Sequence, residues 1–329
     1  MGPQNPQKLA EAVRAGDRRS LAQAITLIES TRSEDRDAAT QLLELLAPHA
    51  GQSIRIGISG VPGVGKSTFI ENFGTYVIEQ GHKIAVLAVD PSSAISGGSI
   101  LGDKTRMETL SMQPKAYIRP SPAGGTLGGV TRHTRETICI VEAAGFDVIV
   151  VETVGVGQSE TAVAEMTDMF MLMLLPGGGD ELQGIKRGII ELADLVVVNK
   201  ADGDLATAAG RAAADYGNAL GFIHPRHPDW EVPVITCSAL QNQGLDKVWE
   251  IIERYTETMS QNGELEKSRA AQAHAWLWSE TAETLLESLK ESPVVREKIT
   301  ELEKAVAAGK TSPWVAAHRL VKTFLQKIN

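Results

Sequence analysis

The spacing of hydrophobic and polar positions changes twice along the chain and divides it into three regions. Up to residue 47 apolar residues recur at helical spacing between charged ones, and Pro48 ends this stretch. From residue 54 short, unbroken apolar runs alternate with longer amphipathic stretches, and after Gly263 the spacing is helical again. The predicted regions are an N-terminal helical extension (1–50), a central α/β domain (51–262) and a C-terminal helical arm (263–329).

Five apolar runs in the central region predict strands. Their residues do not alternate between apolar and polar, which is typical of strands buried on both faces, as in a parallel sheet with helices on either side. The predicted strands are 54–59, 84–89, 148–152, 169–175 and 195–199. The predicted helices are 66–80, 131–144, 184–193, 204–220 and 244–260. The fold class is therefore α/β, with a largely parallel central sheet flanked by helices.

The C-terminal arm divides into three predicted helices, over 264–290, 293–308 and 312–328. Pro293 and Pro313 suit the first turn of a helix. Three of the five tryptophans lie in this region. The pattern alone leaves two interpretations open: the helices pack on their own domain, or they pair two subunits.

Charge and cysteine content exclude several classes of protein. The 41 acidic and 32 basic residues give a formal net charge of -9, which disfavours binding to nucleic acids and to anionic membranes. The two cysteines, Cys139 and Cys237, form no disulfide framework or zinc motif. The first 20 residues lack the apolar core of a signal peptide, and the longest apolar run is too short to cross a bilayer. We expect a cytoplasmic location, or an organelle matrix after import.

A glycine-rich segment between the first strand and the first helix of the central region fits G-x-x-x-x-G-K-[ST], the phosphate-binding P-loop. Glycines let backbone N–H groups turn toward phosphate oxygens, and the helix N-terminus favours the negative charge. Lys66 is expected to reach the β- and γ-phosphates, and Ser67 to ligate Mg²⁺. The residues expected around the phosphates are Gly60, Val61, Pro62, Gly63, Val64, Gly65, Lys66, Ser67 and Thr68.

A second motif, N-K-x-D, ends the strand predicted at 195–199. The carboxylate of Asp202 can accept hydrogen bonds from N1–H and the 2-amino group of guanine together, whereas adenine lacks that pair of donors. Lys200 is expected to lie along the base, and Asn199 to connect this loop to the purine edge. Farther on, Ser238, Ala239 and Leu240 resemble the loop whose backbone N–H meets guanine O6. The predicted ligands are GTP and GDP.

Three acidic residues are candidates for the Mg²⁺ site. Asp90 follows the second predicted strand, and Asp103 lies in a glycine-containing loop. Glu152 occupies the place of the Asp in the D-x-x-G motif of Ras-like proteins, so that Gly155 would offer its N–H to the γ-phosphate. We assign the metal role chiefly to Asp90 and Glu152. The expected catalytic residues are Lys66, Asp90, Glu152 and Gly155.

Together these motifs resemble the MeaB/ArgK family, which includes the human methylmalonic aciduria type A protein. The matching runs include GISGVPGVGKST, RPSPAGGTLGGVTR, ETVGVGQSE and PGGGDELQGIKRGI, in the correct order over about residues 50–240. The resemblance implies a SIMIBI-class GTPase that chaperones adenosylcobalamin-dependent methylmalonyl-CoA mutase, controls its cofactor loading and protects it, without binding cobalamin itself. It also implies a homodimer paired through the C-terminal helices.

The same resemblance implies three switch segments. Residues 92–107 and 152–165 resemble switches I and II, and residues 177–186 resemble a further switch that faces the mutase. Within this third segment Asp180, Gln183 and Lys186 are the expected partner-coupling residues.

Two other functions remain as alternatives. A transport-system kinase gains nothing from a guanine-reading loop, and a nickel-delivery GTPase normally carries Cys/His motifs that this chain lacks. Ras-type proteins position the attacking water with a Gln directly after D-x-x-G, but here Val156 takes that place and Gln158 comes later. Slow intrinsic GTP hydrolysis is therefore expected.

Overall fold

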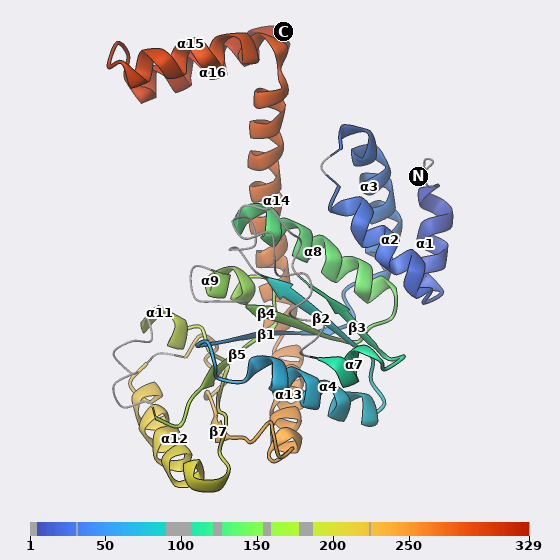
Figure 1. Ribbon diagram of the computed structural model, residues 1–329, viewed down its shortest axis with the longest axis vertical. Helices are drawn as coiled ribbons and strands as arrows, with labels where there is room; N and C mark the ends of the chain where they lie inside the picture. Colours follow the sequence, from blue (N-terminus) through green and yellow to red (C-terminus); the bar gives the residue numbers. More distant parts are fainter. Residues whose placement is uncertain are drawn as a thin grey trace. The chain divides into compact units, whose positions relative to one another are not determined.

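A parallel β-sheet forms the centre of the fold (Figure 1). The computed structural model describes residues 5–30, 32–89, 107–120, 127–153, 159–177, 187–223 and 225–328. Within these residues seven strands pair in the order β3-β2-β4-β1-β5-β6-β7, each parallel to its neighbours. The strands are β1 (Ile54–Gly60), β2 (Ile84–Val89), β3 (Ala116–Arg119), β4 (Val148–Thr153), β5 (Met169–Leu174), β6 (Leu195–Val198) and β7 (Val234–Thr236). The predicted α/β fold with a largely parallel sheet is confirmed.

Helices cover both faces of this sheet. Buried residues of β1 and β5 pack with α4 and α13 on one face, and residues of β2 and β4 pack with α8 on the other. A smaller cluster joins β5 and β6 to α12. The helices of this part are α4 (Lys66–Glu79), α7 (Glu108–Ser111), α8 (Leu127–Ala143), α9 (Ser159–Ala164), α11 (Arg187–Ile190), η2 (Gly203–Leu205), α12 (Ala206–Leu220) and α13 (Leu245–Gln261).

The strands predicted from unbroken apolar runs do not include the two short edge strands, β3 and β7, and one predicted helix is too long. Strand β3 has only four residues and lies at the edge of the sheet, so it lacks the long apolar run that marks the other strands. Helix α11 ends at Ile190, whereas the pattern predicted residues 184–193. After Ile190 the N–H groups of Leu192 and Ala193 bond to carbonyls three residues back, which tightens the chain into a turn before β6.

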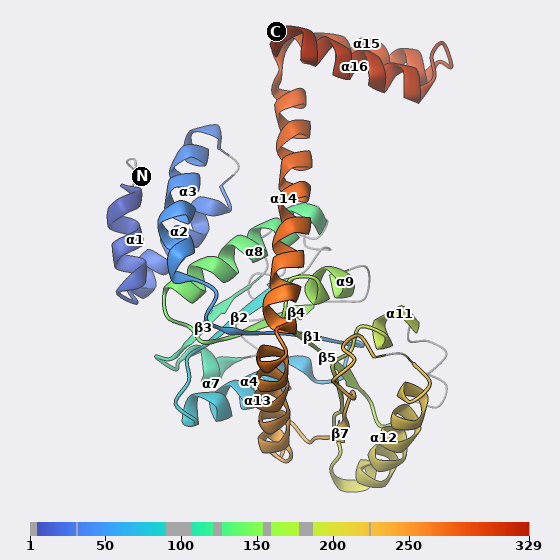
Figure 2. The ribbon, with the colours of Figure 1, turned by 180° about the vertical axis from the view of Figure 1, so that it is seen from behind.

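The N-terminal helices pack against the sheet domain. They are α1 (Pro6–Arg14), α2 (Arg18–Ile28) and α3 (Ser33–Leu46), followed by the short η1 (Ala47–His49). Their apolar side chains share one buried cluster with α8 and with β2, and both ribbon views place them beside α8 (Figures 1 and 2). Arg18 donates to the carbonyl of Pro114 at 3.1 Å, and Glu29 pairs with Arg119 of β3. These polar contacts fasten the helices to the edge of the sheet.

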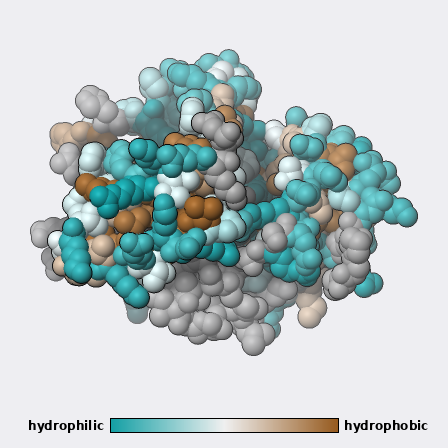
Figure 3. Space-filling view, turned by 90° about the horizontal axis from the view of Figure 1, so that it is seen from above, coloured by the Kyte–Doolittle hydropathy of each residue, from teal (hydrophilic) through white to brown (hydrophobic). Residues whose placement is uncertain are grey.

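Contacts divide the chain into two compact units, residues 1–268 and 269–329. The C-terminal helices are α14 (Glu264–Glu291), α15 (Pro293–Ala307) and α16 (Pro313–Ile328), of which α15 and α16 pack on each other. Several large apolar side chains of the second unit are exposed, among them Trp278 at 63% and Trp314 at 71%. Seen from above, hydrophobic side chains lie between hydrophilic ones on the molecular surface (Figure 3). Among the described residues, no helix combines the length and apolar character that crossing a membrane requires.

Candidate functional site

The connection from β1 to α4 adopts the geometry of a phosphate-binding loop. Gly63 and Gly65 have φ angles of 81° and 92°, which L side chains rarely adopt. Gly60 lies so close to β5 that a Cβ there would be 2.5 Å from the Met173 carbonyl oxygen. A Cβ on Gly65 would be 2.8 Å from the Nδ2 of Asn199. The loop therefore requires its glycines, and α4 begins directly after it at Lys66.

Lys66 is buried at the start of α4, where 8% of it is exposed. Its Nζ donates a 2.7 Å hydrogen bond to the Gly60 carbonyl. Burial lowers the pKa of Lys66, while the charges of Glu152 and Glu160 oppose that effect. A cation held in this way is suited to offset the charge of phosphate groups above the loop.

Glu152 lies at the end of β4, where it is in register with Ile58 of β1 and is 5% exposed. The next residue, Thr153, donates from Oγ1 to the Ser59 hydroxyl at 3.0 Å, which ties the ends of β4 and β1 together. Carboxylate and hydroxyl oxygens are the ligands that Mg²⁺ prefers, so Glu152 and Ser67 fit a magnesium site. Both residues lie on the segments that meet at the phosphate loop.

Several predicted site residues lie outside the described residues. They are Asp90, Asp103, Gly155, Asp180, Gln183 and Lys186.

The N-K-x-D loop lies against the phosphate loop. Asn199 is buried, and its Nδ2 donates to the Val64 carbonyl at 2.8 Å. Lys200 has a φ of 59°, a left-handed conformation, and its Cε lies 3.9 Å from the position of a Cβ on Gly65. The structure therefore brings together the two loops that the sequence assigned to phosphate and base.

The segment after β7 completes the candidate base site. The Ser238 hydroxyl donates to Asp202, and Ala239 N–H donates to the Asn199 Oδ1 at 3.0 Å. The carbonyl oxygen of a bound base could accept from the Ala239 N–H, which would then be shared with Asn199. It could instead accept from the N–H of Leu240, a residue that is 76% exposed. Cys237 is buried in the core, and burial raises the pKa of its thiol to about 12, in keeping with a packing role.

Sequence reasoning missed two residues of this region. Glu160, 4% exposed in the first turn of α9, acts electrostatically on Lys66. Asn72 of α4 donates from Nδ2 to the Ala239 carbonyl at 2.7 Å. Glu160 lies where acidic residues commonly stabilise the start of a helix, and Asn72 lies within a helix, where a polar residue usually faces solvent. Neither position therefore indicated a functional role in the sequence.

Comparison with known proteins agrees with this geometry. The family model described as "Methylmalonyl Co-A mutase-associated GTPase MeaB" matches residues 21–294. The mitochondrial methylmalonic aciduria type A homolog of Mus musculus is 51% identical over 319 residues, covering 94% of this chain and 77% of the mouse protein. The GTPase ArgK of Escherichia coli is 47% identical over 288 residues, covering 87% of each chain.

A solved structure supports the same grouping. The structure described as a LAO/AO transport system kinase is 36% identical and superposes with a TM-score of 0.75 over 99% of this chain and 100% of that one. Since the family model spans most of the chain and these relatives align over nearly all of it, the chain belongs to the MeaB family of methylmalonyl-CoA mutase-associated GTPases.

Proposed function

We propose that this protein binds and slowly hydrolyses GTP in order to control cofactor loading and protection of an adenosylcobalamin-dependent methylmalonyl-CoA mutase. One observation carries the nucleotide part: Asn199 joins the loop that bears Asp202 to the loop that bears Lys66. A single nucleotide would therefore contact a guanine reader and a phosphate cradle at once. The family description names the mutase as the partner of MeaB proteins.

In this proposal each residue has a separate task. Lys66 offsets negative charge on the phosphates, and Asp202 accepts from the N1–H and 2-amino groups of guanine. Ser67 and Glu152, with Asp90 and Asp103, would hold Mg²⁺. Bound there, the ion would neutralise charge on the β- and γ-phosphate oxygens.

The alternative function as a transport-system kinase has one point in its favour, which is the description of the solved relative. The base loop argues against it, because a carboxylate at Asp202 has no pair of donors to accept from on adenine. We therefore favour GTP as the nucleotide. The mutase is the proposed partner, and the proposed location is the cytoplasm.

Partner control is proposed to act through residues 177–186. This segment directly precedes α11 and contains Asp180, Gln183 and Lys186. A bound mutase would hold these polar side chains near the nucleotide and raise GTP turnover without any change in the phosphate loop. The C-terminal helices are proposed to pair two subunits, since they carry exposed large apolar side chains.

Single-turnover hydrolysis of GTP and ATP, each with and without purified mutase, tests the proposal. We expect slow hydrolysis of GTP alone, faster hydrolysis with the mutase, and negligible hydrolysis of ATP. Alanine at Asp180, Gln183 or Lys186 should weaken the stimulation and leave the basal rate nearly intact. Equal rates for the two nucleotides contradict the GTP assignment. A GTP rate that the mutase does not change contradicts the partner assignment.

A further inference from the structure

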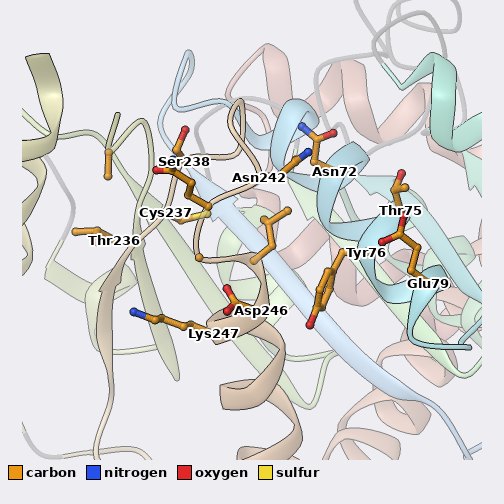
Figure 4. A pocket seen from close by; sticks show the side chains of 14 residues that line it. Asn72, Thr75, Tyr76, Glu79, Thr236, Cys237, Ser238, Asn242, Asp246 and Lys247 are labelled. Carbon is orange, nitrogen blue, oxygen red and sulfur yellow. The ribbon is translucent and has the colours of Figure 1, made fainter. Parts of the chain in front are cut away.

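A cavity of about 570 Å³ lies behind the candidate base loop. Asn72, Tyr76 and Glu79 of α4 line one side of it. The other side is lined by Ser238 and Asn242 of the loop after β7 and by Asp246 and Lys247 at the start of α13 (Figure 4). This space separates the base loop from the helix that begins at the phosphate loop. Ala239 and Leu245 share a buried apolar cluster with Phe73 of α4, so apolar packing contributes to the distance between the loop and α4 beside the polar contacts near the cavity.

The loop itself is a closed turn. Ser238 and Gln243 exchange two backbone hydrogen bonds of 3.0 Å, and Gly244 turns with a φ of 81° into α13. Gly244 is also tightly placed, since a Cβ there would be 3.0 Å from the Thr236 carbonyl. These contacts fix the shape of the turn. Its position relative to α4 depends on contacts with α4 itself.

Asn72 supplies a direct bond across this gap. Its Nδ2 donates to the Ala239 carbonyl at 2.7 Å, while the N–H of the same Ala239 donates to Asn199. Asn199 in turn donates to Val64 in the phosphate loop. The three bonds form a chain from α4 through the base loop to the phosphate loop that precedes α4. Thr75, one turn along, bonds instead to the carbonyl of Glu71 in its own helix.

We propose that Asn72 is a positioning residue for guanine specificity. It holds Ala239, and with it Ser238 beside Asp202, at the place where the base is read. The inference rests on the proposed function, because it assumes that this loop reads guanine. Removing the bond should let the loop shift toward or away from the cavity, so that the donors and acceptors for guanine lose alignment while the phosphate cradle keeps its shape.

The test compares Asn72→Asp and Asn72→Ala with Thr75→Val as the matched control. Aspartate keeps the shape of Asn72 but cannot donate to the Ala239 carbonyl at neutral pH. The Kd values for GDP, ADP and pyrophosphate are measured for each full-length variant by calorimetry. We expect both Asn72 variants to weaken GDP binding about five- to tenfold, the effect of one hydrogen bond. Pyrophosphate binding should change less than twofold, and Thr75→Val should bind all three as the wild type does.

The ratio of the Kd values separates positioning from general damage. A variant that is merely unstable would lose affinity for GDP and pyrophosphate alike, and that result overturns the inference. An Asn72→Asp protein that binds GDP as tightly as the wild type overturns it too. If the wild type itself shows no preference for GDP over ADP, the proposed function fails. If the wild type prefers GDP and the Asn72 variants keep that preference in full, only the role of Asn72 fails.

Discussion

The Lys66 ammonium lies 2.7 Å from the Gly60 carbonyl, so the side chain bends back over the loop from which it starts. The negative charges of Glu152 and Glu160 both stabilise the protonated form of this side chain. A phosphate group would add to that attraction.

We expect Lys66→Ala to lower the rate of GTP hydrolysis about 10²–10³-fold, because such an electrostatic contact contributes that much to a transition state. Single-turnover hydrolysis at saturating GTP measures it. Lys8→Ala, which changes an exposed lysine of α1, is the control. A Lys66→Ala rate within twofold of the wild type would exclude a catalytic role.

Asp202→Asn should weaken the preference for guanine over adenine nucleotides. An amide offers one acceptor and adds donors, so it cannot accept from both guanine groups. Calorimetric titration with GDP and ADP measures the ratio of affinities. Asp204→Asn, two residues away and exposed in η2, should leave that ratio unchanged. An unaltered ratio for Asp202→Asn would place the base elsewhere.

A buried acid outside the candidate site predicts a dependence of stability on pH. Asp194 accepts from the Phe170 N–H at 2.8 Å, and Arg226 lies 3.8 Å away. Burial raises the pKa of Asp194 to about 7. The folded state therefore holds this proton more tightly than the unfolded state, so the group's contribution to stability falls as pH rises from about 4 to about 7.

Asp194→Asn removes the carboxyl group whose ionisation destabilises the folded state. The stability gained by the substitution should therefore increase with pH. One pKa unit corresponds to about 1.4 kcal/mol, so the free energy of unfolding of the variant relative to the wild type should rise by about 2–3 kcal/mol between pH 5 and pH 8. Urea unfolding at both pH values measures it, with Asp215→Asn on the exposed face of α12 as the control. A difference independent of pH would contradict a raised pKa in Asp194.

Truncation after Ser268 should give a folded monomer. The cut follows the boundary between the two compact units and keeps Leu265, which packs on the core of the first. Light scattering of the full-length and truncated proteins tests it, and circular dichroism shows whether the truncated chain is folded. A truncated protein that remains dimeric would place the subunit interface within residues 1–268.

The sequence predicted those features that local pattern encodes. The unbroken apolar runs predicted strands β1 and β2 and placed the phosphate loop between strand and helix. It did not predict the contact between Asn72 and Ala239, because these residues are 167 positions apart and neither belongs to a motif. The pattern also predicted an apolar face on the N-terminal helices, but it did not predict that α8 covers this face. Which surfaces pack together depends on the assembled fold.

That covered face has a consequence for synthesis of the chain. Leu21, Ile25 and Leu42 of the N-terminal helices lie in one cluster with Ile138 and Val141 of α8. Helix α8 is made about 80 residues after α3 ends, which at about 5–20 residues per second is a delay of roughly 4 to 16 seconds. During that interval the nascent helices carry a hydrophobic stripe with no sheet domain to cover it. A chaperone that binds apolar segments would meet this protein first at its N-terminus.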